Sequence, residues 1–315
     1  MARTSAQLLI EATRGLLARL GQPARGPVLI LYGEAKHELA TALHVSLTLQ
    51  GAQAERHMLA GQPSRAFDSA TGAPALHRAA AEGSLVILAD PPQVPWLFDT
   101  VGRPDRGLLL PTEHLYCDWL MPYKSLLRIL SADYGEVRAW RARLLEALRG
   151  ATRLHIATPG GTDLTLAPRR WLAEDGEVFT APHEASIEGT LAVDGALYDG
   201  PPARPTMLRV VEGRVANLKA LGRGSVRQRM LHNDLARDAG AAQVAEFGLG
   251  INPAARPDAQ IMEAEMALGA CHVGFGHNLP YGGANASETH VDVGLLRPTL
   301  TIDGRAICRE GTYVL

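Results

Sequence analysis

The sequence predicts two domains, an α/β domain at residues 1–145 and a β-rich α+β domain at residues 146–315. In the first part, short continuous apolar runs alternate with helix-forming stretches, which is the pattern of a parallel sheet covered by helices. In the second part, strand-like runs are separated by turn pairs that contain glycine, which indicates antiparallel hairpins. The length of 315 residues agrees with this division, because a domain usually has ~100–200 residues.

The first domain is expected to alternate helices and strands from its start. A helix begins near Thr4 or Ser5, because apolar residues then recur at helical spacing as far as Leu20. Residues 27–32 (PVLILY) and 84–89 (SLVILA) are continuous apolar runs of strand length. The further elements expected here are a helix at 36–50, a strand at 54–58, a helix at 75–81, a strand at 107–110 and a helical region at 113–149.

The second domain is expected to begin with a hairpin. Pro159-Gly160-Gly161 lies between strand-like runs at 153–157 and 163–166. Three pairs, each an acidic residue followed by glycine, predict further hairpin turns: Asp194-Gly195, Glu212-Gly213 and Asp303-Gly304. One helix, at 226–238, interrupts this β-rich region.

Composition excludes several classes of function. The formal net charge is −2 and only 5% of residues are aromatic, so neither a cationic surface nor stacking side chains for nucleic acid are expected. No apolar run approaches the ~18–20 residues that span a bilayer. Two Gly-x-Gly segments resemble the start of a dinucleotide-binding fingerprint, Gly248-Leu249-Gly250 and Gly274-Phe275-Gly276. Neither is followed by the third glycine or by the start of a helix that the fingerprint requires. We therefore expect a cytoplasmic protein that binds neither nucleic acid nor a membrane.

Ionisable residues stand inside apolar, glycine-rimmed strands of the second domain. In His290-Val291-Asp292, positions i and i+2 of a strand point to one face, so an imidazole and a carboxylate converge there. His272, Glu246 and Glu177 lie in similar runs, where a carboxylate is costly unless it is paired or bound to a metal. Each signal alone also fits a surface His–Asp pair or a hydrogen-bonded core residue. Together they favour one shared site for a divalent metal with mixed nitrogen and oxygen ligands.

Several spaced motifs follow one another in the second half of the chain. They are residues 177–182 (EVFTAP), residues 186–189 (SIEG), residues 245–253 (AEFGLGINP), residues 265–276 (EMALGACHVGFG), and Gly282-Gly283 with Asn285 before His290-Val291-Asp292. This order resembles the thermophilic metallo-aminopeptidase (aminopeptidase T) superfamily, of which the chain looks like a short, divergent member. In the first half the resemblance is only a general likeness to the α/β domain.

The resemblance implies a thermophilic metallo-aminopeptidase-like fold and a complete set of metal ligands. By position, the ligands would be Glu177, Glu246, His272, His290 and Asp292. Ligands of these types suit two divalent ions, Zn, Mn or Co. The implied function is metal-dependent hydrolysis of an amide or peptide bond in a small molecule or short peptide, through a metal-activated water. Members are often dimers, so we expect a homodimer.

Three residues near the expected ligands are candidates for catalysis. Glu265 opens a motif and could shuttle the proton from water to the leaving nitrogen. His277 and Tyr281 lie in the glycine-rich loop before His290, where they could face the substrate. The family's tyrosine in this loop would fall at Leu279, so Tyr281 stands two residues late.

Two alternative functions stay open at this point. The chain is also similar to the 2,5-dihydroxypyridine 5,6-dioxygenases, which hold one ferrous iron with two histidines and an aspartate. Here His272, His290 and Asp292 could form such a triad, with Fe(II) as the cofactor. We favour hydrolysis because Glu177 and Glu246 are both retained, whereas the dioxygenase pattern lacks the first and has histidine in place of the second. The other alternative is a non-catalytic binding protein on the same scaffold.

Overall fold

The computed structural model describes residues 4–20, 27–58, 84–88, 122–174 and 176–315. By their contacts the residues form two compact units, Met1–Tyr134 and Gly135–Leu315. The domain boundary expected between residues 145 and 146 falls inside helix α8 (Tyr134–Ala147), and it stays a prediction. Among the described residues, no helix combines the length and the apolar composition that crossing a bilayer requires.

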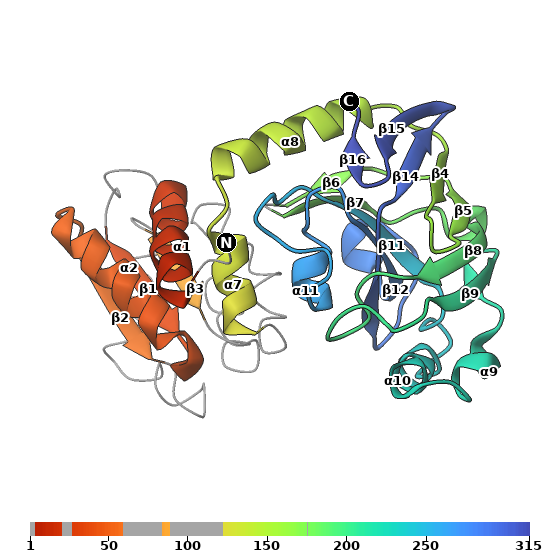
Figure 1. Cartoon of the computed structure of the whole chain (residues 1–315), viewed down its shortest axis with the longest axis horizontal. Coiled ribbons are helices and arrows are strands. Elements are labelled where there is room, and N and C mark those ends of the chain that lie inside the picture. The colour runs from red at the N-terminus through yellow and green to blue at the C-terminus, as the bar shows by residue number, and fades with distance from the viewer. Residues whose placement is uncertain (1–3, 21–26, 59–83, 89–121, 175) are drawn as a thin grey trace. The chain divides into compact units, whose positions relative to one another are not determined.

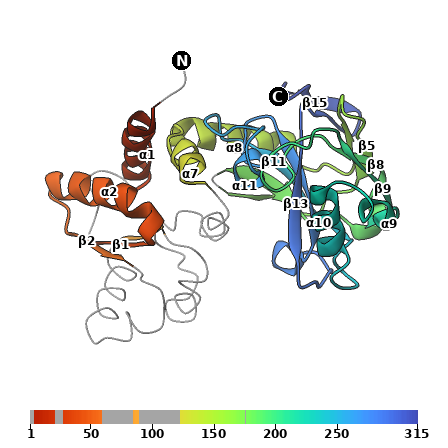
Figure 2. The same ribbon diagram turned by 60° about the horizontal axis from the view of Figure 1, so that its bottom comes forward.

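The first unit contains a three-stranded parallel sheet in the order β2-β1-β3. Its strands are β1 (Val28–Tyr32), β2 (Ala54–Met58) and β3 (Ser84–Leu88). Among its described residues, this unit has the helices α1 (Ser5–Leu20), η1 (Glu34–Lys36), α2 (His37–Leu49) and α7 (Tyr123–Leu130). Helix α2 contacts β1 and β2, and α1 contacts α2 and α7 (Figure 2). The parallel sheet and its first helices are therefore as the apolar runs predicted.

The helical region expected at 113–149 is helical where it is described, but it consists of two helices, because α7 ends at Leu130 and α8 begins at Tyr134. Its part at 113–121 lies outside the described residues. The Ser131 hydroxyl donates a hydrogen bond of 2.7 Å to the Arg128 carbonyl, which satisfies a helix-end acceptor and closes α7. The helix expected at 75–81 and the strand expected at 107–110 lie outside the described residues.

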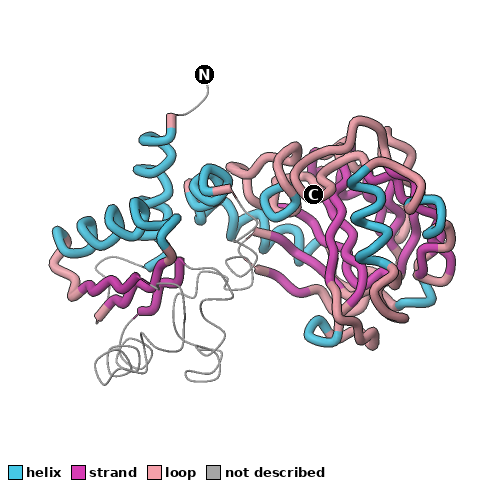
Figure 3. The backbone as a smooth tube through the Cα atoms, turned by 90° about the horizontal axis from the view of Figure 1, so that it is seen from below, coloured by secondary structure: helices cyan, strands magenta, loops and turns pink. Residues whose placement is uncertain are grey.

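The second unit contains two antiparallel sheets (Figures 1 and 3). The eight-stranded sheet has the order β10-β9-β8-β5-β4-β14-β15-β16. Its strands are β4 (Leu154–Ala157), β5 (Asp163–Leu166), β8 (Glu188–Val193), β9 (Thr206–Val211), β10 (Arg214–Val215), β14 (Thr299–Ile302), β15 (Arg305–Arg309) and β16 (Thr312–Tyr313).

The five-stranded sheet has the order β13-β12-β11-β7-β6. Its strands are β6 (Leu172–Ala173), β7 (Glu177–Thr180), β11 (Val244–Gly250), β12 (Cys271–Gly276) and β13 (His290–Leu295). Short helices connect the strands: η4 (Glu184–Ser186), α9 (Leu218–Leu221), α10 (Val226–Leu235), α11 (Ile261–Ala264) and η5 (Leu279–Tyr281). The sheets are tied together where Tyr313 on β16 donates a 2.8 Å hydrogen bond to the Gly250 carbonyl on β11.

Most of the turn predictions in this unit are confirmed. The hairpin of β4 and β5 pairs as expected, and Glu212-Gly213 and Asp303-Gly304 each join two strands with both residues at positive φ. Asp194-Gly195 is a correction, because β8 ends at Val193 and β9 begins only at Thr206. The pair is used in a tertiary contact instead. Its Gly195 amide donates to the Gly294 carbonyl at 3.0 Å, and an Asp194 oxygen accepts from the Leu296 amide at 2.8 Å.

One face of the five-stranded sheet belongs to the core of the second unit. The side chains that alternate onto this face are apolar and fully buried, and they include Val178, Phe247, Leu249, Val273, Phe275 and Val293. Burying such a row contributes about 25 cal/mol for each Å² of apolar surface removed from water. Because side chains alternate along a strand, the same strands must send their remaining side chains to the opposite face.

Candidate metal centre

The five predicted metal ligands all lie on the face of the five-stranded sheet opposite the apolar core. Glu246 on β11 is paired with Gly274 on β12, which is paired with Asp292 on β13. Two residues along each strand, His272 is paired with Gly248 on one side and with Gly294 on the other. Residues opposite one another or two apart share a face, so the strands bring the ligands together without any contribution from a loop.

Every one of these five residues has a glycine as a cross-strand partner. Glu177 is opposite Gly250 and His290 is opposite Gly276, in addition to the pairs above. A Cβ atom on Gly248 would lie 2.0 Å from Cε1 of His272, so the imidazole occupies the space over this glycine. A Cβ atom on Gly274 would lie 2.7 Å from Oδ1 of Asp292 and 3.0 Å from Nε2 of His290. The glycines therefore provide the room in which large polar side chains meet.

The first group of converging side chains consists of Glu177, Glu246 and His272. One ligand atom from each lies within 4.8 Å of the others. Nε2 of His272 is 3.3 Å from Oε2 of Glu177 and 3.4 Å from Oε1 of Glu246. All three residues are at most 5% exposed. Two buried carboxylates and one buried imidazole thus point at a single place.

The second group consists of Glu246, His290 and Asp292, so Glu246 belongs to both. Nε2 of His290 is 3.4 Å from Oε2 of Glu246 and 3.3 Å from Oδ1 of Asp292. The His290 and Asp292 side chains are 26% and 17% exposed, so this group is closer to solvent than the first. Glu246 presents one oxygen to each histidine.

Strong electrostatic coupling follows from this arrangement. Burial alone would lower the pKa of His272, but the charge of Glu177, the hydrogen bond to Glu246 and the charges of Asp292 and Glu246 raise it to about 10. Burial likewise opposes the charged form of His290, yet Asp292 and Glu246 hold the pKa of that ring well above its usual value. Burial would raise the pKa of Glu246, while hydrogen bonds from the two histidines lower it. The cluster thus concentrates negative charge that cations stabilise.

A backbone carbonyl and an aromatic side chain orient the His290 ring. Its Nδ1 lies 2.8 Å from the backbone carbonyl of His277 and donates a hydrogen bond to it. A ligating histidine commonly donates its second ring nitrogen to a carbonyl in this way, which leaves the other nitrogen for the metal. Tyr281 borders the same ring, at 5.7 Å between ring centroids, and Phe179 borders Tyr281 at 5.3 Å.

The three predicted catalytic residues have different positions. Tyr281 lies beside His290, as described above. His277 contributes its carbonyl oxygen to His290, and its ring belongs to neither ligand group. Glu265 follows helix α11, is 4% exposed and also belongs to neither group. Their catalytic roles therefore stay predictions.

The donor set fits divalent metal ions. The three carboxylates and two imidazoles are ligand types of zinc, manganese, cobalt and iron, and each group offers three converging ligand atoms. The hydrogen bond at Nδ1 of His290 leaves Nε2 as the nitrogen that faces Glu246 and Asp292. Without a metal, protons on the two histidines offset the negative charge of these carboxylates. A bound cation would displace those protons.

Sequence reasoning missed the glycine partners and the role of Phe179. The strands read Glu-x-Gly-x-Gly at 246–250, His-x-Gly-x-Gly at 272–276 and His-x-Asp-x-Gly at 290–294. This period of two, with ligands and glycines at alternate positions, is the signal that could have identified them. Phe179 follows Glu177 by two residues and is opposite Gly248, so the same period places it on the ligand face.

The chain matches the family described as thermophilic metalloprotease (M29) over residues 139–314. No curated protein matches it. Its fold is similar to that of a 2,5-dihydroxypyridine dioxygenase from Pseudomonas putida KT2440, with a TM-score of 0.68, 18% identity, and 99% of this chain and 98% of the other covered. It is also similar to wild-type AmpT from Thermus thermophilus, with a TM-score of 0.57, 18% identity, and 97% and 99% covered.

Proposed function

The chain belongs to the thermophilic metalloprotease (M29) family, and we propose that it is a metal-dependent hydrolase of an amide or peptide bond in a small substrate. The family match covers the second unit, which contains all five candidate ligands. We assign catalysis to the domain predicted at 146–315. Glu177, Glu246, His272, His290 and Asp292 would hold the metal.

The observation that carries this proposal is the position of Glu246 in both ligand groups. Its two oxygens face different histidines, so this carboxylate is suited to bridge two ions. A single iron held by His272, His290 and Asp292 is the arrangement of the alternative function. Among the described residues, the two histidines never share a group, since each lies with Glu246 and a different second carboxylate. This division favours two ions, for which zinc, manganese or cobalt is suited.

The proposed reaction adds water across a carbon–nitrogen bond, which yields a carboxylic acid and an amine. When bound, the divalent ions would lower the pKa of a water molecule and polarise the scissile carbonyl. The protein's own contribution is to fix the ligands on a rigid sheet, with the Phe179 and Tyr281 rings at one border. Rigid placement matters because a displacement of about 1 Å can cost roughly 100-fold in rate.

Proton transfer to the leaving nitrogen needs a further group. We propose Tyr281 as the residue that contacts the substrate, because its ring adjoins His290 at the more exposed ligand group. Glu265 is proposed as the proton shuttle, and the ring of His277 as a residue near the substrate. Glu265→Gln tests the shuttle role, and Tyr281→Phe tests the contact with the substrate. A shuttle role predicts a loss of kcat with little change in KM.

A dioxygenase with one Fe(II) is the second candidate function. It is supported by the fold similarity to the 2,5-dihydroxypyridine dioxygenase, at a TM-score of 0.68 over 99% of the chain. That enzyme's activity belongs to that protein, and at 18% identity the similarity concerns the fold. The two functions differ in metal, in stoichiometry and in the need for oxygen.

Elemental analysis combined with an activity assay tests the proposal. The purified protein would be loaded with zinc, manganese, cobalt or ferrous iron, and assayed with aminoacyl p-nitroanilides and short peptides. We expect two equivalents of metal and amide hydrolysis, both lost in Glu246→Gln. The matched control is His155→Ala, because His155 pairs with Asp163 at 2.8 Å in the other sheet and lies outside both ligand groups.

Other outcomes would identify the other functions. One equivalent of iron, lost in His272→Ala but kept in Glu246→Gln, together with oxygen uptake on a hydroxylated pyridine, would establish the dioxygenase. Unchanged metal content and activity in His290→Ala and Asp292→Asn would favour a non-catalytic binding protein. A homodimer is proposed from the resemblance, and light scattering would measure its mass. A cytoplasmic location is proposed from the composition alone.

A further inference from the structure

The loop between β12 and β13, residues 277–289, lies beside the second ligand group. Through the carbonyl of His277 it accepts the hydrogen bond from Nδ1 of His290. Through Tyr281 it places an aromatic ring against that same histidine. The position of this 277–289 loop therefore determines how the His290 ring is held, and the residues that anchor the loop act on the metal centre indirectly.

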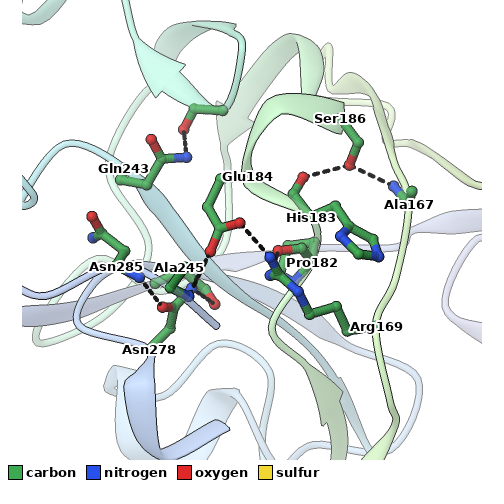
Figure 4. A network of polar contacts seen from close by, with 12 residues as sticks. Ala167, Arg169, Pro182, His183, Glu184, Ser186, Gln243, Ala245, Asn278 and Asn285 are labelled. Atoms are coloured by element: carbon green, nitrogen blue, oxygen red, sulfur yellow. Dashed lines mark hydrogen bonds and ion pairs between the residues drawn. The ribbon is translucent and has the colours of Figure 1, made fainter. Parts of the chain in front are cut away.

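Asn278 anchors the 277–289 loop from within the protein. It is 0% exposed, and its amide makes three hydrogen bonds (Figure 4). Its Nδ2 donates to the Ala245 carbonyl at 3.2 Å and to Oε1 of Glu184 at 3.4 Å, and its Oδ1 accepts from the Asn285 amide at 2.8 Å. Ala245 directly precedes Glu246, so one side chain ties the loop to the strand of the shared ligand.

Glu184 connects this loop to a different part of the unit. Its Oε1 also accepts a 2.9 Å hydrogen bond from the Ala284 amide, so one oxygen binds two positions of the loop. Its Oε2 accepts from Nη2 of Arg169 at 2.6 Å. Arg169 is itself fixed, because its Nη1 donates to the Pro182 carbonyl at 2.5 Å (Figure 4).

Neighbouring groups stabilise the charged form of Glu184. Burial alone would raise its pKa, but hydrogen bonds from Arg169 and from the Ala284 amide lower it to about 2. The side chains of Arg169 and Glu184 are 22% and 23% exposed, so the pair is partly shielded from water. Charge-assisted hydrogen bonds of this kind are roughly twice as strong as neutral ones.

We propose that Glu184 is a positioning residue of the metal centre: it holds the 277–289 loop through Asn278 and Ala284, and the loop in turn holds the ring of His290. The glutamate belongs to neither ligand group and acts only through other residues. The hydrogen bonds of Glu184 to Asn278 and Ala284 are sufficient for the anchoring of the loop. Only the effect of Glu184 on metal binding rests on the proposed function.

Glu184→Gln is the informative variant. The substitution keeps the shape but replaces one acceptor oxygen by an NH₂ group, which only donates. Either Arg169 or the loop therefore loses its acceptor. Asp199→Asn is the matched control, because Asp199 is a carboxylate that pairs with Arg227 at 2.7 Å and forms no hydrogen bond or ion pair with residues 277–289. Arg169→Lys is a milder second variant, since one ammonium replaces the planar fork that reaches Pro182 and Glu184.

Hydrogen exchange and histidine NMR on the metal-free protein form the first test. In Glu184→Gln we expect about tenfold faster exchange of the amides in 278–285 and of the Nδ1 proton that His290 donates to His277, with the rest of the unit unchanged. Arg169→Lys should show a smaller change in the same segment, and Asp199→Asn none. Unchanged exchange in this segment, or equally faster exchange across the whole unit, would overturn the proposal.

Metal titration forms the second test. Changes beyond the direct ligands typically lower metal affinity 10–100-fold, so in Glu184→Gln we expect about tenfold weaker binding at one of the two sites. Equal weakening of both sites, or no weakening despite a loosened loop, would contradict the positioning role. If the wild-type protein binds no metal, the proposed function fails, and the exchange of the loop amides and of the His290 Nδ1 proton still decides whether Glu184 anchors the loop.

Discussion

Glu246 and Gly274 are directly opposed on strands β11 and β12, and a Cβ atom on the glycine would lie 2.9 Å from the glutamate's own Cβ. The same added atom would lie within 3.0 Å of His290 and Asp292. The absence of a side chain at position 274 is therefore a condition for the second ligand group to assemble.

Alanine at the two glycines should affect the ligand groups separately. Gly274→Ala crowds the ligand atoms of Asp292 and His290, and it meets Glu246 only at Cβ, with the carboxylate further away. Gly248→Ala crowds the ring of His272. We expect each variant to lose about one of two metal equivalents, measured by elemental analysis after dialysis against limiting zinc. Loss of both ions from both variants, with an unchanged melting temperature, would contradict separate groups.

Removing one carboxylate from each group should have a similarly selective effect. Glu177→Gln alters only the buried group, and Asp292→Asn alters only the more exposed one. Each should retain one metal equivalent, while Glu246→Gln should retain none because it belongs to both groups. Isothermal titration with zinc would distinguish these outcomes, and identical stoichiometries in the three variants would argue against a bridging carboxylate.

Tyr281→Phe removes the hydroxyl group and keeps the aromatic ring, so it tests the hydroxyl alone. The ring contacts with Phe179 and His290 are retained, so metal content should be unchanged. If the hydroxyl contacts the substrate, kcat should fall at least tenfold. Tyr281→Ala is the companion variant, because it also removes the ring and should weaken metal binding. Full activity in Tyr281→Phe would remove the tyrosine from the mechanism.

The ion pair of Glu184 should make stability depend on pH in acid. Its pKa is lowered from 4.5 to about 2 in the folded protein, so its stabilisation is present above pH 4.5 and is lost as the pH falls toward 2. At pH 7, Glu184→Gln should lower the free energy of unfolding by roughly 1.5–3 kcal/mol, the usual range for hydrogen bonds to charged groups.

Urea unfolding at several pH values measures this effect. The difference between wild type and Glu184→Gln should shrink between pH 4.5 and 2. Asp199→Asn, which alters a more exposed pair, should change stability by less than about 1 kcal/mol. A constant difference for Glu184→Gln across this pH range would show that its charge does not stabilise the fold.

The five predicted ligands converge in the structure, and their convergence could be expected from the sequence because each interrupts an apolar strand. Their role as ligands stays a prediction. His290 and Asp292 have the period of two that a strand requires, and Glu246 and His272 each stand between apolar neighbours. Local patterns also predicted two strand pairings. A helix between β1 and β2 indicates a parallel pair, and a turn with two glycines between β4 and β5 indicates a hairpin.

Long-range contacts account for what the sequence did not reveal. Asp194-Gly195 has the composition of a tight turn, but docking against Gly294 and Leu296 overrides that local preference. Glu184 is 94 residues away from Asn278 and 100 from Ala284. The residues next to Glu184 in the sequence do not indicate that it bonds to Asn278 or Ala284, because these hydrogen bonds depend on how the 277–289 loop folds.

The two-sided pattern of the five-stranded sheet makes metal uptake a measure of folding accuracy. A strand that slipped by one residue would turn its ligands toward the apolar interior and its valines and phenylalanines toward the opposite face. For β12, such a slip would exchange His272 with Cys271 or Val273. A misaligned molecule would thus lose its hydrophobic core and its affinity for metal in the same event, so bound metal would report correct strand alignment.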